Sequence, residues 1–214
     1  MQQNRGGRLW RGKGFADDSE KKLWDRMRKS YEFLSRVRSV PIIGKPIFGI
    51  LDRLQNIPPF YPIKDMSNPS PQAKLIKKYI EKGLSKGALE IVKQKPLPLI
   101  SSHPIPALAA DYHGFSRNYC IIADAEIARA WVAMDPRKSH IHYLAPCGRA
   151  VMRLRTYGVP DERIFLTGFP FPLKLLGDKN LSLLKYDAAQ RLHYLDPNNR
   201  FWPLHHVNVK YFLG

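Results

Sequence analysis

The chain has 214 residues, which suits one large domain or one domain with a basic extension. Its composition, 44% hydrophobic and 11% aromatic, excludes disorder throughout. It contains no apolar run of about 18 residues and no charged segment leading into an apolar signal region, so we expect neither a membrane-spanning helix nor an obvious secretion signal.

Net charge is the unusual property of this composition. The 35 Lys and Arg against 18 Asp and Glu give +17, and residues 1–100 alone carry 21 basic and 9 acidic side chains, a net +12. A strongly basic N-terminal half beside a less basic C-terminal half favours a polyanionic partner, either nucleic acid or an anionic membrane surface. Cys120 and Cys147 lie in or beside predicted strands, so we expect buried free thiols rather than a disulfide.

The N-terminal quarter contains an arm, a helix and an apolar segment. We expect residues 1–22 to form a flexible basic arm. Residues Leu23–Val37 have helical periodicity, with one apolar stripe of Leu23, Met27, Tyr31 and Leu34. Residues Pro41–Ile63 are rich in Pro, Ile and Phe, and two readings stay open: a segment in a membrane interface, or a helix packed on the domain.

A helical pattern follows the turn at Asn68–Pro71 and extends from Leu75 to Val92. Lysines occupy its other side, where they either face solvent or contact phosphates. Gly83 and Gly87 weaken this helix and indicate a break.

Four β-rich runs then recur, each followed by a turn and most by a helical pattern: Leu97–Ser102, Asn118–Asp124, His140–Pro146 and Arg163–Gly168. Their nearly continuous apolar centres are typical of parallel strands covered on both faces. We therefore predict an α/β fold with a Rossmann-like parallel sheet and helices on both faces. The expected helices are Ile105–Ala110, Ile127–Met134 with Trp131 in the core, and Gly148–Tyr157 with Arg149, Arg153 and Arg155 outside.

Ligands of open parallel sheets gather at the carboxyl ends of the strands. Polar residues follow the first two strands there: Ser101, Ser102, His103 and Pro104 after the first, and Asp124 after the second. The free N–H groups of the next helix could hold a phosphate or a sugar hydroxyl. His113 and Gly114 lie in the following loop and complete the candidate set. His140 and His142 lack a third ligand nearby, so no metal site is expected.

The run TYGVPDERIFLTGFPFP, Thr156–Pro172, resembles the end of the N-terminal domain of two-domain GT-B glycosyltransferases. Ser102-His103-Pro104 looks like the strand-end motif of the diacylglycerol glycosyltransferases, the monogalactosyldiacylglycerol synthase-like enzymes. Tyr119–Asp124 is similar to their next strand, and His140–Cys147 to the strand that ends in a Pro-Ser or Pro-Cys step. The resemblance covers roughly residues 68–172.

This resemblance implies half of a GT-B architecture. Residues 23–172 would be an acceptor-binding domain, incomplete at its N-terminal strand, and Gly168, Phe169 and Pro170 would form the hinge. Residues 173–214 would be a linker and the start of a truncated second domain, with a helix near Ala188–Tyr194 and a strand in Val207–Gly214.

The resemblance also implies the chemistry and its partners. A nucleotide sugar would be the donor substrate, held by a missing second domain or a partner chain, and no cofactor is needed. His103 and Asp124 are the catalytic candidates, with Ser101, Ser102, His103, Pro104, His113 and Gly114 at the acceptor, a lipid or other membrane-associated molecule. We expect a cytoplasmic protein, peripheral at an anionic membrane and inactive alone.

Two other functions stay open. The first is a basic α/β nucleic-acid-binding protein, which predicts aromatic side chains exposed among the lysines, whereas Trp24, Phe33 and Tyr79 fall on or near apolar stripes. The second is a scaffold half that does no chemistry and partners another chain.

Overall fold

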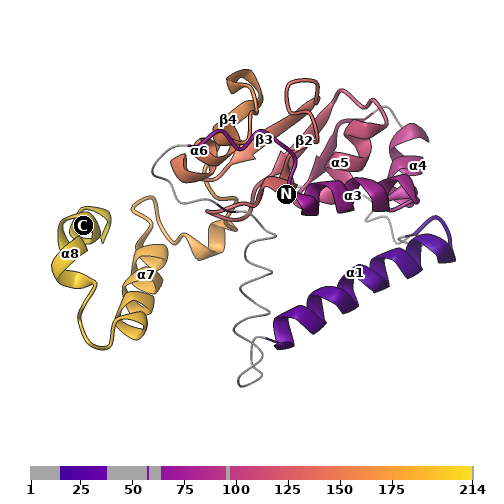
Figure 1. The fold of residues 1–214 in the computed structure, drawn as a ribbon. Coiled ribbons are helices and arrows are strands. Elements are labelled where there is room, and N and C mark those ends of the chain that lie inside the picture. The colour runs from indigo at the N-terminus through magenta and orange to yellow at the C-terminus, as the bar shows by residue number, and fades with distance from the viewer. Residues whose placement is uncertain (1–14, 38–56, 58–63, 95–96, 214) are drawn as a thin grey trace, which may run out of the picture. The chain divides into compact units, whose positions relative to one another are not determined.

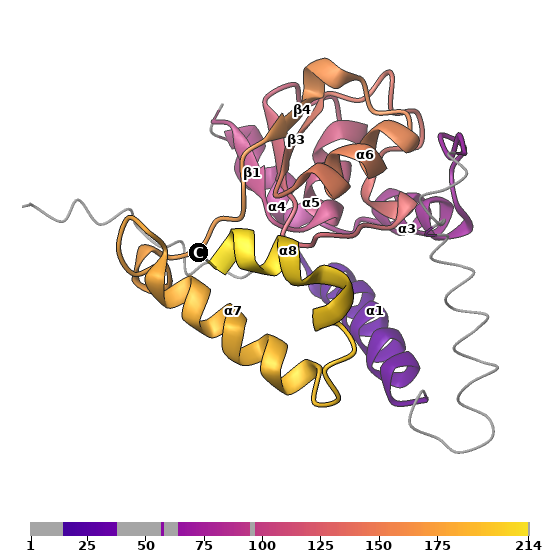
Figure 2. The ribbon, with the colours of Figure 1, turned by 90° about the vertical axis from the view of Figure 1, so that its left-hand side faces the viewer.

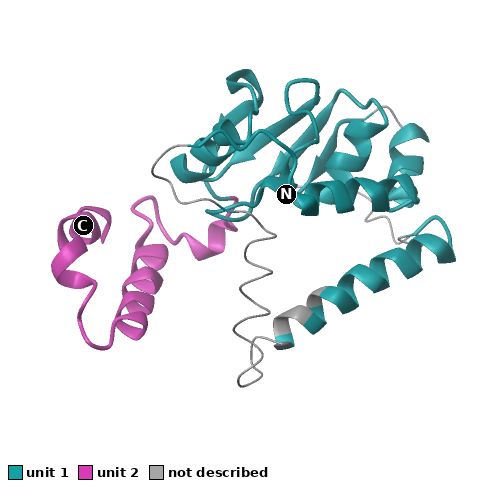
Figure 3. Cartoon of the chain, viewed as in Figure 1, with its two compact units in different colours: residues 1–169 teal, residues 170–214 magenta. Residues whose placement is uncertain are grey.

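The computed structural model describes residues 15–37, 57, 64–94 and 97–213 (Figure 1). The chain divides into two compact units, residues 1–169 and residues 170–214 (Figure 3). The greater part of the predicted arm and, except for Ile57, the Pro41–Ile63 segment lie outside the described residues.

The first unit is built on a sheet of four parallel strands in the order β1-β2-β3-β4. Each strand lies inside one of the four predicted runs: β1 is Leu99–Ser101, β2 is Asn118–Ile121, β3 is Ile141–Ala145 and β4 is Ile164–Leu166. The predicted α/β class with a Rossmann-like parallel sheet is thereby confirmed.

Two helices connect strands of this sheet, α5 (Pro104–Tyr112) between β1 and β2, and α6 (Gly148–Thr156) between β3 and β4. Right-handed crossovers between strands in sequential order place such helices on one face of the sheet. Figure 2 shows α5 and α6 on the same side of the strands. Fully buried Ala107, Ala109 and Ala110 let α5 approach the sheet closely.

The two faces of the sheet differ in burial. Asn118, Cys120 and Tyr143 point to the helical face and are buried, whereas Ile100 is 63% exposed and Phe165 44% exposed on the other. On that second face the rings of Tyr119 and His142, which are in register, lie 5.2 Å apart between centroids. Within the described residues, the cover of the sheet is fuller on the helical face.

The predicted helix Ile127–Met134 is wrong. Only a single turn, η1 (Arg129–Trp131), is helical, and the backbone is extended on both sides of it. Pro136 has no N–H to donate to the carbonyl of Val132, which accepts instead from the fully buried guanidinium of Arg129 at 2.9 Å. Trp131 is partly buried and packs against the core.

The predicted break in the lysine-rich helix is confirmed. The pattern forms α3 (Pro71–Glu81) and α4 (Lys86–Gln94), separated by Gly83 and Ser85, which have φ values of +100° and 68°. Glycine adopts such left-handed values without a steric cost, and serine does not. Ser70 caps α3 by accepting the N–H of Ala73 at 3.2 Å.

Helix α1 (Asp18–Val37) begins earlier than expected, so the predicted arm 1–22 is wrong for its last five residues. Asp17 caps the helix, because its Oδ1 accepts the N–H of Glu20 at 2.9 Å. The spacing Asp17-x-x-Glu20 is a helix-start signal that we missed. Leu23 and Met27 pack against the core as predicted, while the side chains of Tyr31 and Leu34 lie outside the description.

The regular elements of the second unit, in its described residues 170–213, are all helices. It contains the turn η3 (Leu173–Leu175), α7 (Ser182–Leu195), which includes the helix expected near Ala188–Tyr194, and α8 (Trp202–Leu213). The predicted strand in Val207–Gly214 is therefore wrong. The carboxylate of Asp196 accepts the N–H groups of Arg200, Phe201 and Trp202, which starts a helix there.

In the described part of the chain, no helix combines the length and the apolar character needed to cross a bilayer.

Candidate functional site

The end of β1 and the start of α5 form a short hydrogen-bonded turn. The Ser101 hydroxyl donates to the His103 carbonyl at 2.7 Å and accepts the His103 N–H at 3.1 Å. His103 is the N-cap of α5, and its Nδ1 accepts the N–H of Ile105 at 3.3 Å. These bonds fix the backbone of the strand end and the orientation of the imidazole, while Ser102 stays exposed. Pro104 is buried as the first residue of the helix.

The capping bond assigns the protonation of His103. Since Nδ1 accepts a hydrogen bond, the proton of the neutral ring lies on Nε2. Burial of the ring lowers the pKa of His103. At neutral pH the residue therefore presents an N–H donor, and it cannot act as a general base through Nδ1 without losing the cap of α5.

Trp24 of α1 lies beside this imidazole, with ring centroids 6.3 Å apart and the planes tilted by 58°. The indole N–H of Trp24 donates to Glu20 at 3.4 Å. The sequence places Trp24 only on or near an apolar stripe of its helix. A stripe gives the buried side of a helix but not the element it packs against, so the sequence held no signal for this contact.

Asp124 follows β2 at the same edge of the sheet. It lies three residues beyond Ile121, the last residue of β2, and its side chain is exposed. Because β1 and β2 are neighbouring parallel strands, Asp124 and the Ser101–His103 turn both lie at the carboxyl edge. Toward a hydroxyl group a carboxylate is a hydrogen-bond acceptor and the imidazole N–H is a donor.

The start of α6 opens at this same edge, after Cys147. Behind it, Arg153 is buried and forms an ion pair with Glu126, with 2.5 Å between Nε and Oε1. The prediction that Arg153 lies outside is therefore wrong, because its carboxylate partner comes from the loop after β2. Arg149 and Arg155 are exposed as predicted. The pair ties that loop to α6.

His113 and Gly114 do not join this edge. They follow the C-terminus of α5, and its nine residues span about 13 Å at 1.5 Å per residue. His113 instead lines a pocket of about 440 Å³ with residues of α3, α4 and the turn between them, among them Lys77, Leu84 and Lys93. The predicted acceptor set is thus divided between two ends of one helix.

The predicted hinge coincides with the division between the units, which falls between Phe169 and Pro170. Gly168 has a φ of +80°, a left-handed value that favours glycine. As for metals, the described residues contain no group of three or more His, Cys, Asp or Glu side chains that could hold an ion. His140 lies 3.6 Å from the carboxylate of Asp111, and His142 contacts the rings of Tyr119 and Phe165.

Comparison of the chain with protein-family models, with curated proteins and with solved structures gave no significant match.

Proposed function

We propose that the chain is the acceptor-binding portion of a nucleotide-sugar-dependent glycosyltransferase, acting on a lipid or another membrane-associated acceptor. The observation that carries the proposal is the set of polar groups at the carboxyl edge of the parallel sheet. His103 supplies a neutral donor after β1, and Asp124 supplies a carboxylate after β2. The motif resemblance of residues 68–172 supports the class of reaction.

In this reaction an acceptor hydroxyl attacks the anomeric carbon of the sugar. The carbon–oxygen bond to the nucleoside diphosphate breaks, the hydroxyl proton passes to a base, and the diphosphate leaves. His103 Nε2–H orients the acceptor hydroxyl by donating to its oxygen, and Asp124 accepts its proton. In this proposal the donor binds to a separate nucleotide-binding domain or to a partner chain.

Binding of a soluble short-chain diacylglycerol to the full chain tests the proposal. By isothermal titration calorimetry, Asp124→Asn should weaken binding by about 10- to 150-fold, as loss of a charged hydrogen bond corresponds to roughly 1.5–3 kcal/mol. Asp135→Asn, an exposed carboxylate paired with Lys138 at 3.5 Å, serves as the matched control and should leave affinity unchanged. Tight, salt-dependent binding of single-stranded RNA without diacylglycerol binding would favour the nucleic-acid function instead.

A further inference from the structure

The two helices of the second unit leave most of their large apolar side chains exposed. Val209 is its only buried residue among those described, at 9% exposure. Large apolar side chains at nine-tenths to four-tenths exposure occur on both helices and around them: Leu173, Leu175, Leu183, Tyr186, Tyr194, Leu195, Phe201, Trp202, Leu204, Val207, Tyr211 and Phe212. Patches of this kind mark interaction surfaces.

Helix α8 has two distinct apolar sides. Val209, Trp202 and Leu213 line a pocket of about 220 Å³ together with Ala189 and Leu192 of α7, so this side packs on α7. Positions i, i+3 and i+7 on the other side are Leu204, Val207 and Tyr211.

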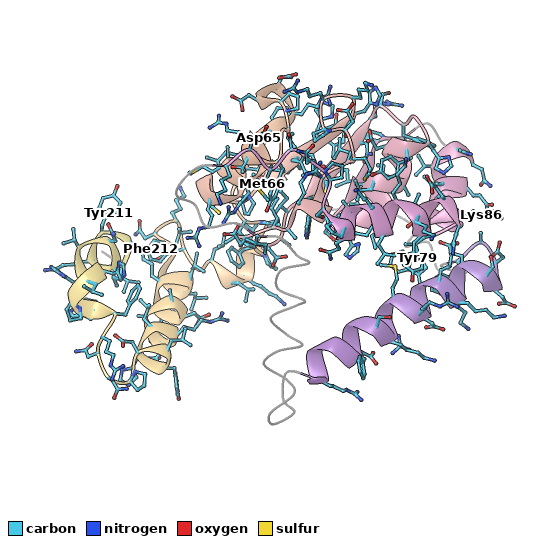
Figure 4. All side chains as sticks on the ribbon, in the orientation of Figure 1. Asp65, Met66, Tyr79, Lys86, Tyr211 and Phe212 are labelled. Carbon is cyan, nitrogen blue, oxygen red and sulfur yellow. The ribbon has the colours of Figure 1, made fainter. Side chains whose placement is uncertain are left out.

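At about 100° per residue, Leu204, Val207 and Tyr211 form one stripe, opposite Val209. We call these three residues the α8 stripe. They are 79%, 67% and 92% exposed, and Figure 4 shows Tyr211 projecting outward from α8.

Charge indicates what covers the α8 stripe. Residues 170–214 carry six Lys and Arg against three Asp, a net +3, within a chain of net +17. Two of the three carboxylates, Asp178 and Asp196, accept backbone N–H groups at helix starts and are thus satisfied locally. Lys210 precedes Tyr211 directly in the helix. An apolar stripe with aromatic residues and a positive surround fits the headgroup level of an anionic bilayer.

We propose that the α8 stripe docks the protein on an anionic lipid bilayer, with Leu204, Val207 and Tyr211 inserted at the level of the headgroups. The inference rests on the proposed function in one respect, because it places the chain at the membrane that holds the acceptor. It assigns membrane contact to the second unit. Binding strength follows from the buried apolar area and from attraction of the basic surface, so both anionic lipid and the stripe are required.

The test is sedimentation of the full chain with vesicles of phosphatidylcholine and phosphatidylglycerol that contain no diacylglycerol. The double variant Leu204→Glu/Tyr211→Glu should bind about 100-fold more weakly, because loss of burial costs about tenfold at each of the two side chains. The matched control is Phe33→Glu/Leu75→Glu in the first unit, at side chains 64% and 52% exposed. The control adds the same two negative charges and should bind nearly as well as the wild type.

A second readout locates the contact. Brominated lipids should quench a tryptophan placed in the stripe by Val207→Trp more strongly than Trp202, which lies on the side of α8 that faces α7. Equal binding of both double variants would overturn the proposal. So would a stable dimer, seen by light scattering, that the stripe variant dissociates while neither protein binds vesicles, since the stripe would then contact a second copy.

These outcomes are separable from those of the proposed function. Diacylglycerol binding in solution does not involve the α8 stripe, so the stripe variant should keep it. Vesicle binding without diacylglycerol does not involve Asp124, and Asp124→Asn should sediment as the wild type does.

Discussion

The carboxylate of Glu20 in α1 accepts the N–H of Gly87, the second residue of α4, at 2.9 Å between Oε2 and the nitrogen. The same oxygen accepts the N–H of Ala16 at 2.8 Å, and Glu20 is 2% exposed. A carboxylate at the start of a helix satisfies free N–H groups and complements the helix dipole. Only glycine fits at position 87, since a Cβ would lie 2.7 Å from the nitrogen of Ala16.

Replacement of Glu20 should release α1 from α4. Glu20→Ala leaves the backbone N–H groups of Ala16 and Gly87 and the indole N–H of Trp24 without this acceptor, so we expect a loss of about 1–3 kcal/mol in the free energy of unfolding. Urea unfolding measures it. Asp25→Ala, which removes an exposed pair to Arg28, should cost a few tenths of a kcal/mol, roughly the value of a surface ion pair. Equal losses for both variants would contradict the role of Glu20.

Arg129 should be among the most sensitive positions of the first unit. Its guanidinium is fully buried and donates only to backbone carbonyls among its hydrogen bonds, including Ser67 at 2.6 Å and Val132 at 2.9 Å. Arg129→Met leaves these carbonyls unsatisfied, and we expect a loss of about 3 kcal/mol or more by denaturant unfolding. The exposed Arg137→Met serves as control and should change stability by less than about 0.5 kcal/mol.

Replacement of Ser85 by glycine should stabilise the protein. It is buried with a left-handed φ of 68°, and its hydroxyl has no hydrogen-bond partner among the described residues. Ser85→Gly should raise stability by about 1 kcal/mol, because the left-handed conformation costs a non-glycine residue 1–2 kcal/mol. Ser139→Gly, at a buried serine whose hydroxyl accepts the N–H of Ile141, should destabilise instead. A higher melting temperature for Ser139→Gly than for Ser85→Gly would contradict backbone strain at Ser85.

His103 should make stability depend on pH. Burial lowers its pKa below the ordinary value of 6.5, so the unfolded chain binds this proton first. The folded state therefore has its full stability above about pH 6.5 and loses part of it as the pH falls toward the pKa of His103 in the folded protein. His103→Asn keeps a capping group without a proton to bind. The free energy of unfolding in urea can be measured from about pH 7 to about pH 5, a range that includes the ordinary histidine pKa of roughly 6.5. It should fall less over this range for the variant than for the wild type. Parallel curves for the two proteins would exclude the effect.

The two thiols should differ in reactivity. Burial raises the pKa of Cys120 to about 12, whereas Cys147 is only partly buried. Because the thiolate is the reactive form, iodoacetamide should alkylate Cys147 in the native protein and Cys120 only after unfolding. Mass spectrometry counts the adducts, and native Cys147→Ser should take up none. Rapid double alkylation of the native wild type would be incompatible with a buried Cys120.

Local pattern determined much of this protein. Apolar runs bounded by turn residues located all four strands, and their rhythm indicated parallel pairing. Gly83 indicated the break between α3 and α4, and the Pro104–Pro106 start indicated α5. The Ser101, His103 and Asp124 edge followed from the same pattern, since parallel strands in neighbouring positions share their carboxyl edge. These features depend on residues close together in sequence, and so the sequence alone contains them.

Tertiary structure decided the rest, because its reasons are contacts between distant residues. The carboxylate of Glu20 accepts a hydrogen bond from the N–H of Gly87, which is 67 residues away in sequence. Arg153 points inward because its guanidinium binds the carboxylate of Glu126, which lies in the loop after β2. The apolar run at Val207 satisfies strand and helix patterns equally, and it becomes a helix because Asp196 caps its start and α7 covers Val209. Periodicity reports that a side chain is buried, but the partner that buries it is chosen only by the folded chain.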